Sequence, residues 1–341
     1  MARLTAISGL NRKSAALFLV EIGGRRILFD FGDGLEPGEH PDIASIGKVD
    51  ALCLSHAHED HIGSLMRLGD VGMPPVFATR RCFDDSPASI APADRCEIPQ
   101  QGQFDLLGIP ITVGRSGHAP GGVWFHLPTD LGGFIYSGDV SAESNSMPMD
   151  PMPPAATLLI DASYGDRDSL LSDQKQQMIA QAKGGAVVCC PPAGRGADMV
   201  DTFRQAGYDV KAEAIIAREY QTAMGQAVPV VNVQSARPDD VIVTTGSNGE
   251  EGLSAALLQR EGFRFLFSSH VPKGCPAYPL IASKRAQWLP WNVHPRLRDI
   301  LIWADQCRAD RVIPAFLDVT TAPKLMSGLG SRLALEREME I

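Results

Sequence analysis

The most constraining feature of this sequence is the six-residue window His56-Ala57-His58-Glu59-Asp60-His61, which contains three of the chain's eight histidines. The window is separated only by Ser55 from Val49 to Leu54, a mainly apolar stretch with the length and composition of a buried strand. A polar cluster at the end of a buried strand is predicted to form a loop on a rigid scaffold, where proteins carry many of their functional residues. The fold must therefore include a sheet that presents this loop at its edge.

The composition of the window is that of a metal site. His56 and His58 are two residues apart on an extended loop, so they can point to the same side and bind one ion, while Asp60 and His61 can turn toward a neighbouring ion. Imidazole and carboxylate ligands suit Zn²⁺ or a similar divalent ion such as Mn²⁺. The alternative, a polar turn before a helix, does not require three histidines in six residues.

Two further candidate ligands follow strand-like stretches. His118 lies in S-G-H-A-P-G-G, and Asp139 lies in Y-S-G-D-V. Each is a weak signal by itself, because a His or Asp beside glycine is often a turn or capping residue. They become candidate metal ligands because the same chain also contains the histidine-rich window.

The pattern of apolar residues divides the chain into regions. Two strands joined by Gly23-Gly24 predict an antiparallel hairpin near the start. From about Ser169 the strands alternate with helix-like segments, which is typical of a parallel sheet covered on both faces. We expect an α/β protein in which residues 1–168 form one domain, 169–262 form an inserted α/β domain, and 263–341 return to the first domain.

Charge and cysteine content exclude other classes of protein. The formal charge of -9 argues against a surface uniformly coated in basic residues for wrapping nucleic acid, although a local basic path remains compatible with it. The seven cysteines form no Cys-x-x-Cys pair, so we expect reduced thiols in a cytoplasmic protein. No apolar run approaches the ~18 residues needed to span a membrane.

The order of these motifs resembles that of the metallo-β-lactamase superfamily: Asp30 after a strand, then the His56–His61 window, His118, and Asp139. The resemblance implies an αββα sandwich with a metal site at the edge between its sheets. It also implies that His56, His58 and His118 hold a first ion, that Asp60 and His61 hold a second, and that Asp139 bridges them, with Asp30 in a supporting position. Either one or two Zn²⁺ ions are expected, with Mn²⁺ as an alternative.

Later segments resemble the β-CASP nucleases of this superfamily. Asp161 in I-D-A-S-Y-G-D-R looks like their acidic strand-end motif, and Gly194-Arg195 looks like their Gly-Arg entry to a helix. The implied partner is a single-stranded nucleic acid, in RNA processing or DNA repair, and a homodimer and a larger processing complex are the two assemblies considered. Arg195 and Lys273 are the candidate substrate-binding cations, and the short insert suggests exonucleolytic trimming.

The resemblance assigns the general acid to His294, which precedes a predicted helix and the strand-like R-V-I-P-A-F. In that register the last metal-binding histidine of the family falls on Phe316, which cannot bind a metal. A rival register makes His270 the acid and His294 the last ligand, but the Pro- and Gly-rich segment after His270 fits a helix poorly. His270 then remains either a substitute near the site or a structural histidine.

The expected reaction is hydrolysis of a phosphodiester by a metal-bound hydroxide, with His294 as general acid, oriented by Asp161. Two alternatives stay open. One is a small-molecule ester hydrolase of the same fold, since one fold supports many reactions. The other is a non-catalytic partner subunit, which Phe316 would explain.

Overall fold

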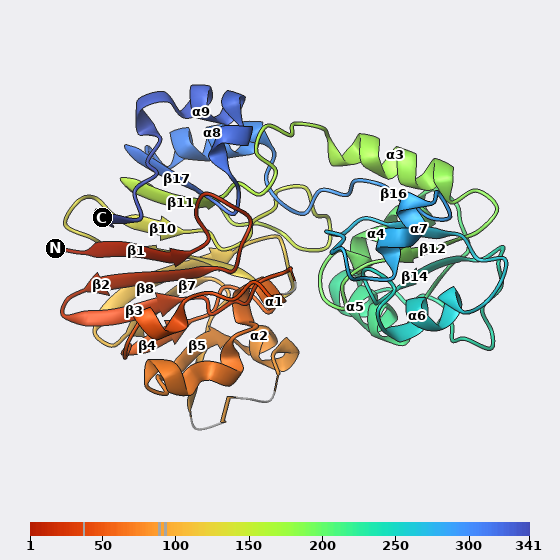
Figure 1. The fold of residues 1–341 in the computed structure, drawn as a ribbon, viewed down its shortest axis with the longest axis horizontal. Helices are drawn as coiled ribbons and strands as arrows, with labels where there is room; N and C mark the ends of the chain where they lie inside the picture. Colours follow the sequence, from red (N-terminus) through yellow and green to blue (C-terminus); the bar gives the residue numbers. More distant parts are fainter. Residues whose placement is uncertain (37, 88–89, 92–93) are drawn as a thin grey trace. The chain divides into compact units, whose positions relative to one another are not determined.

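The computed structural model describes residues 1–36, 38–87, 90–91 and 94–341, and Figure 1 shows its helices and strands. The chain divides into two compact units, here called the sandwich and the insert. The sandwich contains residues 1–142, 148–168 and 294–341, and the insert contains residues 143–147 and 169–293. The sandwich thus resumes at His294, so our expected return at residue 263 is wrong.

Two sheets form the centre of the sandwich. The first has the order β18 (Glu338–Glu340), β1 (Arg3–Ser8), β2 (Leu17–Ile22), β3 (Arg25–Phe29), β4 (Ala51–Cys53), β5 (Val76–Thr79) and β6 (Arg95–Ile98). The second has the order β17 (Arg311–Ala315), β11 (Thr157–Asp161), β10 (Phe134–Tyr136), β9 (Val123–Leu127), β8 (Ile109–Arg115) and β7 (Gly102–Leu106).

The expected hairpin opens the first sheet. Strands β2 and β3 pair antiparallel, and the intervening Gly23 and Gly24 have φ of 58° and 75°. Two consecutive positive φ angles are what a tight hairpin turn needs, and glycine adopts them without steric cost. From β3 to β6 the pairing is parallel, so each of these strands delivers its following loop to the same edge of the sheet.

Helices cover both outer faces of the sandwich (Figure 1). On the first sheet lie α1 (Glu59–Ile62), α2 (Arg80–Asp85) and the 3₁₀ segments Ile43–Ser45 and Leu65–Val71. On the second lie α8 (Leu297–Gln306) and α9 (Pro323–Leu329), with short 3₁₀ segments at Val319–Thr321 and Gly330–Arg332.

The main core fills the space between the two sheets. Aromatic rings meet there edge to face, with Phe29 and Phe125 at 5.3 Å between ring centroids and Phe29 and Tyr136 at 5.7 Å. Such pairs add to the stabilisation that comes from burying the rings. The layer order of helices, sheet, sheet and helices is the expected αββα sandwich.

The insert is a parallel sheet with helices, as the alternating pattern predicts. Its strands have the order β13 (Val210–Ala212), β14 (Val241–Thr244), β12 (Ala186–Cys189), β15 (Phe265–Phe267) and β16 (Gln287–Trp288). Its helices are α3 (Leu171–Gln181), α4 (Gly196–Gln205), α5 (Ala214–Met224), α6 (Gly252–Leu258) and α7 (Ala277–Ala282).

Membership of β15 and β16 in this sheet explains why the insert extends to residue 293. Neighbouring residues of its central strands enter opposite cores, Val188 and Val243 on one face and Val187 and Ile242 on the other. Because both faces are covered, these strands are continuously apolar rather than alternating.

A search of the helices in the described part of the chain finds none with the length and apolar content of a membrane span.

Candidate metal centre

Loops at the ends of sandwich strands bring the predicted ligands together. His56 and His58 follow β4, and His61 lies in the short helix α1. His118 follows β8 and Asp139 follows β10, so residues far apart in sequence meet at one edge of the sandwich. Each loop begins at a buried strand, which holds its position rigidly.

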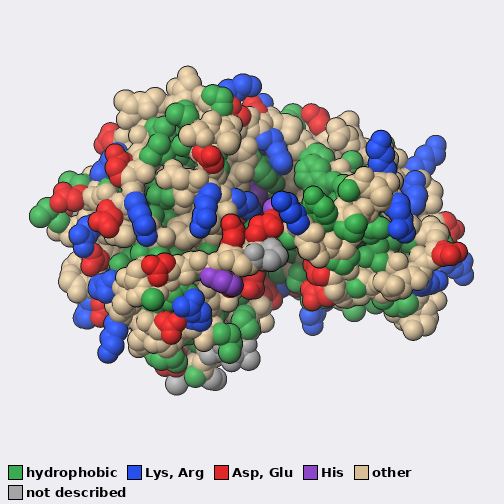
Figure 2. All heavy atoms as spheres, in the orientation of Figure 1, with side chains coloured by type: hydrophobic (Ala, Val, Ile, Leu, Met, Phe, Trp, Pro, Cys, Tyr) green, Lys and Arg blue, Asp and Glu red, His purple; other side chains and the backbone are tan. Residues whose placement is uncertain are grey.

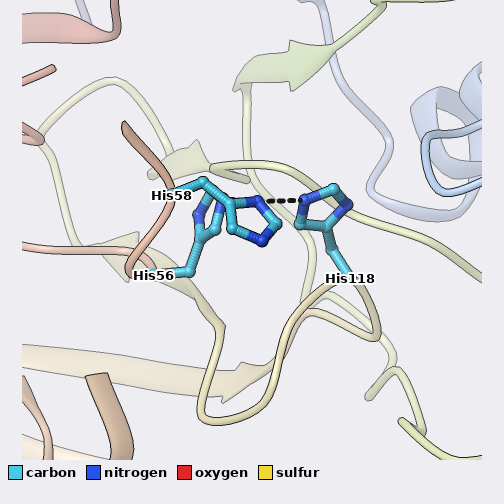
Figure 3. Close-up of side chains that lie close together, drawn as sticks. All are labelled: His56, His58 and His118. Carbon is cyan, nitrogen blue, oxygen red and sulfur yellow. Dashed lines mark hydrogen bonds between the residues drawn. The ribbon is translucent and has the colours of Figure 1, made fainter. Parts of the chain in front are cut away.

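His56, His58 and His118, here called the three-histidine group, turn their rings toward one another (Figure 3). Nδ1 of His58 lies 3.1 Å from Nε2 of His56 and 3.0 Å from Nε2 of His118. Oδ2 of Asp139 lies 3.5 Å from Nε2 of His118 and 4.0 Å from Nε2 of His56. Ligands of a tetrahedral zinc ion with bonds of 2.0–2.1 Å are about 3.3 Å apart, so the three imidazole nitrogens fit a single ion, and Oδ2 of Asp139 lies near two of them.

The opposite side of Asp139 faces His61. Its Oδ1 lies 3.3 Å from Nε2 of His61, and within the described part of the chain neither buried atom has a hydrogen-bond partner. Buried polar atoms without partners are rare in folded proteins, because leaving them unbonded costs free energy. The nitrogen atoms of the three-histidine group and the buried carboxylate of Asp139 are ligands of the kind that a divalent metal takes, so the residues present fit such an ion.

Asp30 holds His61 in this orientation. Its Oδ2 lies 2.6 Å from Nδ1 of His61, and it also accepts hydrogen bonds from the hydroxyl groups of Ser55 and Tyr136. The backbone N–H of Ser55 donates to Oδ1 of Asp30 at 2.6 Å. A carboxylate on the far nitrogen of an imidazole is the usual support for a metal-binding histidine. Asp30 therefore fixes the His61 ring in place, and its supporting role toward a metal stays a prediction.

His294 and Asp161 form a pair beside the three-histidine group. Nδ1 of His294 lies 2.8 Å from Oδ2 of Asp161 and 3.5 Å from Oδ2 of Asp139. The ring of His294 also contacts Tyr164, whose own ring lies beneath the Arg167 guanidinium at 3.9 Å. His294 is thus fixed by Asp161 on one nitrogen, as a general acid requires, and it also forms a ligand-sized group with His118 and Asp139.

Burial and neighbouring charges oppose each other across the centre. Burial lowers the pKa of His56, and the three neighbouring imidazoles lower it further. Burial also disfavours the charged form of His61, but Asp139 and Asp30 outweigh this effect and raise its pKa well above the usual value. Burial disfavours the carboxylate of Asp139, yet His61 and His294 lower its pKa well below the usual value. Asp139 therefore remains a negatively charged carboxylate, which can bind a metal ion.

Several predicted site residues lie outside this arrangement. Asp60 belongs to none of the ligand-sized groups found among the described residues. In the insert, His270 is exposed after β15, and its carbonyl accepts a hydrogen bond from Asn248 at 2.9 Å. Arg195, at the start of α4, is 5% exposed and donates to Ser269, whereas Lys273 is exposed. Their roles stay predictions.

The prediction from sequence missed four side chains near the centre: Lys13, Ser55, Tyr136 and Tyr164. Three of them adjoin a recognised motif, because Ser55 precedes His56, Tyr136 begins Y-S-G-D and Tyr164 belongs to I-D-A-S-Y-G-D-R. Adjacency was therefore an available signal. Lys13 has no such signal, since it adjoins none of the recognised motifs along the sequence.

Comparison with known proteins supports a common family. Residues 12–180 match the model of the metallo-beta-lactamase superfamily. Ribonuclease TTHA0252 of Thermus thermophilus is 29% identical over 191 residues, which cover 48% of this chain and 44% of the relative. Transcription termination factor FttA of Methanosarcina mazei is 24% identical over 232 residues, covering 54% of this chain and 36% of the relative. The matched parts are thus less than half of either relative.

A solved structure supports the fold over the whole chain. A protein of unknown function from Enterococcus faecalis V583 superposes with a TM-score of 0.66 at 15% identity, covering 100% of both chains. At this identity the likeness concerns the fold alone. Residues 12–180 therefore form a metallo-β-lactamase superfamily domain, and the named relatives support a β-CASP nuclease-like member of that superfamily.

Proposed function

We propose that the chain is a metal-dependent phosphodiester hydrolase that cleaves RNA or DNA. The observation that carries this proposal is the convergence of the three-histidine group and Asp139 beside the His294–Asp161 pair. The names of the two relatives, a ribonuclease and a transcription termination factor, support nucleic acid as the substrate. A single-strand exonuclease is the form that we favour, because the insert is short.

The three-histidine group and Asp139 would hold the ion. A bound divalent ion would neutralise a phosphoryl oxygen and lower the pKa of water toward neutrality. Asp161 accepts a hydrogen bond from Nδ1 of His294, which leaves Nε2 to carry the proton that a leaving oxygen needs. Asp161 also orients the ring, because a carboxylate fixes both the tautomer and the direction of an imidazole.

Charge on the surface agrees with a local rather than a general path for nucleic acid. Figure 2 shows Lys and Arg side chains interspersed with Asp and Glu over the face that it draws. Since phosphate contacts come from lysine and arginine, a nucleic-acid strand would contact only those surface positions where these residues lie. Exposed Lys273, Lys284 and Arg285 of the insert are the candidates.

The test uses end-labelled single-stranded RNA and DNA of one sequence, together with a small phosphodiester, bis(p-nitrophenyl) phosphate. Wild-type protein loaded with Zn²⁺ or Mn²⁺ is compared with His118→Ala and His294→Asn. His126→Gln is the matched control, because His126 lies on β9 and belongs to no ligand-sized group among the described residues. We expect cleavage of a polymer by the wild type and the control, and strong loss in both test variants.

Two results would overturn the proposal. Equal cleavage by wild type, His118→Ala and His294→Asn would indicate a contaminating nuclease. Hydrolysis of the small diester without cleavage of either polymer would favour a small-molecule hydrolase. Product lengths from the two labelled ends show whether cleavage is exonucleolytic and in which direction it proceeds.

A further inference from the structure

The two sides of Asp139 are completed by different residues. On the side of the three-histidine group, imidazole nitrogens supply the ligands. On the other side, the ring of Phe316 packs against His61 at 5.4 Å between centroids and is only 4% exposed. Among the described residues, the only side chain that joins His61 and Asp139 in a ligand-sized group is His56, which the three-histidine group already uses.

The loop that carries Lys13 is fixed on this same side. The carbonyl of Gly9 accepts a hydrogen bond from the backbone N–H of Phe316 at 2.8 Å. The hydroxyl of Ser14 accepts one from the N–H of Gly9 at 3.1 Å, which closes the loop. Just beyond it, the N–H of Ala16 donates to the carbonyl of Asp60 at 2.8 Å. The loop therefore lies between Phe316 and Asp60.

Gly9 also shows how tightly this loop approaches Phe316. Its φ is 95°, and a Cβ built on it would lie 3.2 Å from the Phe316 ring and 2.5 Å from the Phe18 ring. A larger residue would push the loop away from the end of β17. The short distance between loop and ring thus depends on a glycine at position 9.

Lys13 brings a positive charge to the carboxylates of the centre. Crowding by protein atoms disfavours its charged form, but Asp60, Asp139 and Asp161 outweigh this effect, in that order, and raise the pKa of the ammonium. Much of the residue remains exposed, so solvent weakens these attractions. Lys13 therefore carries its positive charge on a loop whose backbone is hydrogen-bonded to Phe316 and is followed by a bond to Asp60, the same side that has His61.

We propose that Lys13 and Phe316 together take the place of a second metal ion. The centre then holds one ion, bound by the three-histidine group and Asp139, while Phe316 closes the His61 side and the Lys13 ammonium balances Asp60. A fixed cation at this position would also attract a phosphate group, as an ion would, without having to be bound from solution. The effect on phosphate rests on the proposed function, whereas the number of ions does not.

The test measures bound Mn²⁺ in the full chain by elemental analysis and by titration followed with electron paramagnetic resonance. We expect about one equivalent in the wild type, because the His61 side shares His56 with the three-histidine group and so lacks a complete ligand set of its own. Lys13→Met should bind a second ion about tenfold more tightly than the wild type does, because removing one nearby positive charge lowers the repulsion of a cation. Adding Phe316→His should bring the content to about two equivalents, since imidazole is a ligand and phenyl is not.

Arg12→Met is the matched control, because it removes a cation from the same loop at the neighbouring exposed position. It should leave both the ion content and the second-ion affinity unchanged. Histidine tolerates a positive φ better than most residues, and Phe316 has φ of 65°, so the substitution at 316 suits the backbone. Melting temperatures of all variants show whether each one folds.

The results separate this inference from the proposed function. Two tightly bound ions in the wild type would overturn the inference, even if the protein cleaves nucleic acid. A folded double variant that still binds one ion, or Arg12→Met that behaves like Lys13→Met, would do the same. One ion in the wild type with no cleavage of any polymer would leave the inference standing and overturn the proposed function.

Discussion

The three-histidine group and the His61 side share Asp139, yet their neighbours differ in kind. The first gathers nitrogen atoms 3.0–3.1 Å apart. The second has one imidazole, which is supported by Asp30 and covered by the Phe316 ring. Both sides take residues from the same six-residue window, so closeness along the sequence does not make two candidate ligands equivalent. The residues that arrive from distant loops decide what each half can bind.

The largest loss of activity should come from removing a ligand of the three-histidine group. His118→Ala removes one nitrogen ligand and leaves Asp139 with fewer partners, so the ion should bind too weakly to act. Since a metal supplies several kcal/mol of transition-state stabilisation, we expect kcat/KM to fall about a thousandfold or more. Elemental analysis after gel filtration, beside kinetics with saturating Zn²⁺, tests this expectation. Full metal content in His118→Ala would show that the group is not the binding site.

The next effect concerns the His294–Asp161 pair. His294→Asn removes the proton donor while the three-histidine group stays intact, so kcat should fall about 10²- to 10⁴-fold at unchanged metal content. Asp161→Asn should lower kcat less, because the imidazole remains but loses its carboxylate. If His294→Asn instead loses the ion, His294 is a ligand, as its closeness to Asp139 also permits.

A smaller effect tests whether an ion touches His61. Asp30 is fully buried, and Asp30→Asn weakens several of its hydrogen bonds, so it should reduce stability by about 1–3 kcal/mol. Urea unfolding of the metal-free variant measures this cost. Loss of support for a bound histidine would reduce metal affinity about 10- to 100-fold. If the centre holds one ion that does not contact His61, Asp30→Asn should change the metal affinity much less. A 10- to 100-fold loss of metal affinity would contradict the one-ion centre.

The smallest effect is a difference in pH dependence between the two sides in metal-free protein. His61 has a raised pKa, so its contribution to stability is complete below about 6.5 and is lost as pH rises through the folded-state pKa. His56 has a lowered pKa, so protonation of the unfolded chain costs stability below about 6.5. His61→Gln should therefore lose more stability, relative to wild type, at pH 6 than at pH 9.

His56→Gln should show the opposite trend, with a smaller relative loss of stability at pH 6 than at pH 9. Melting temperatures with chelator present measure both variants against wild type at each pH. Parallel curves for the two variants would mean that the two sides do not differ in charge as described.

Strand-rich and helix-rich regions were predictable because their signals are local. The hairpin at Gly23-Gly24 needs only a positive-φ turn between apolar runs, and the parallel sheet of the insert is visible as continuous apolar strands. The end of the insert was not predictable, because F-R-F-L-F has the same composition whichever sheet it joins. Pairing of β15 with β12 was decided by contacts between residues distant in sequence.

Residue type and position along the chain were enough to identify the side chains that could bind a metal, since these are ligand residues that follow strand-like stretches: His56, His58, His61, His118 and Asp139. The sequence did not determine which of them share an ion, because ligand atoms must come within a few ångströms in space. Only the tertiary structure placed Phe316 on His61, brought the Lys13 loop beside Asp60 and left Asp60 outside the ligand-sized groups of the described residues. The spacing of residues within one loop limits which side chains can point the same way, whereas the distances between side chains of different loops depend on how the two sheets pack.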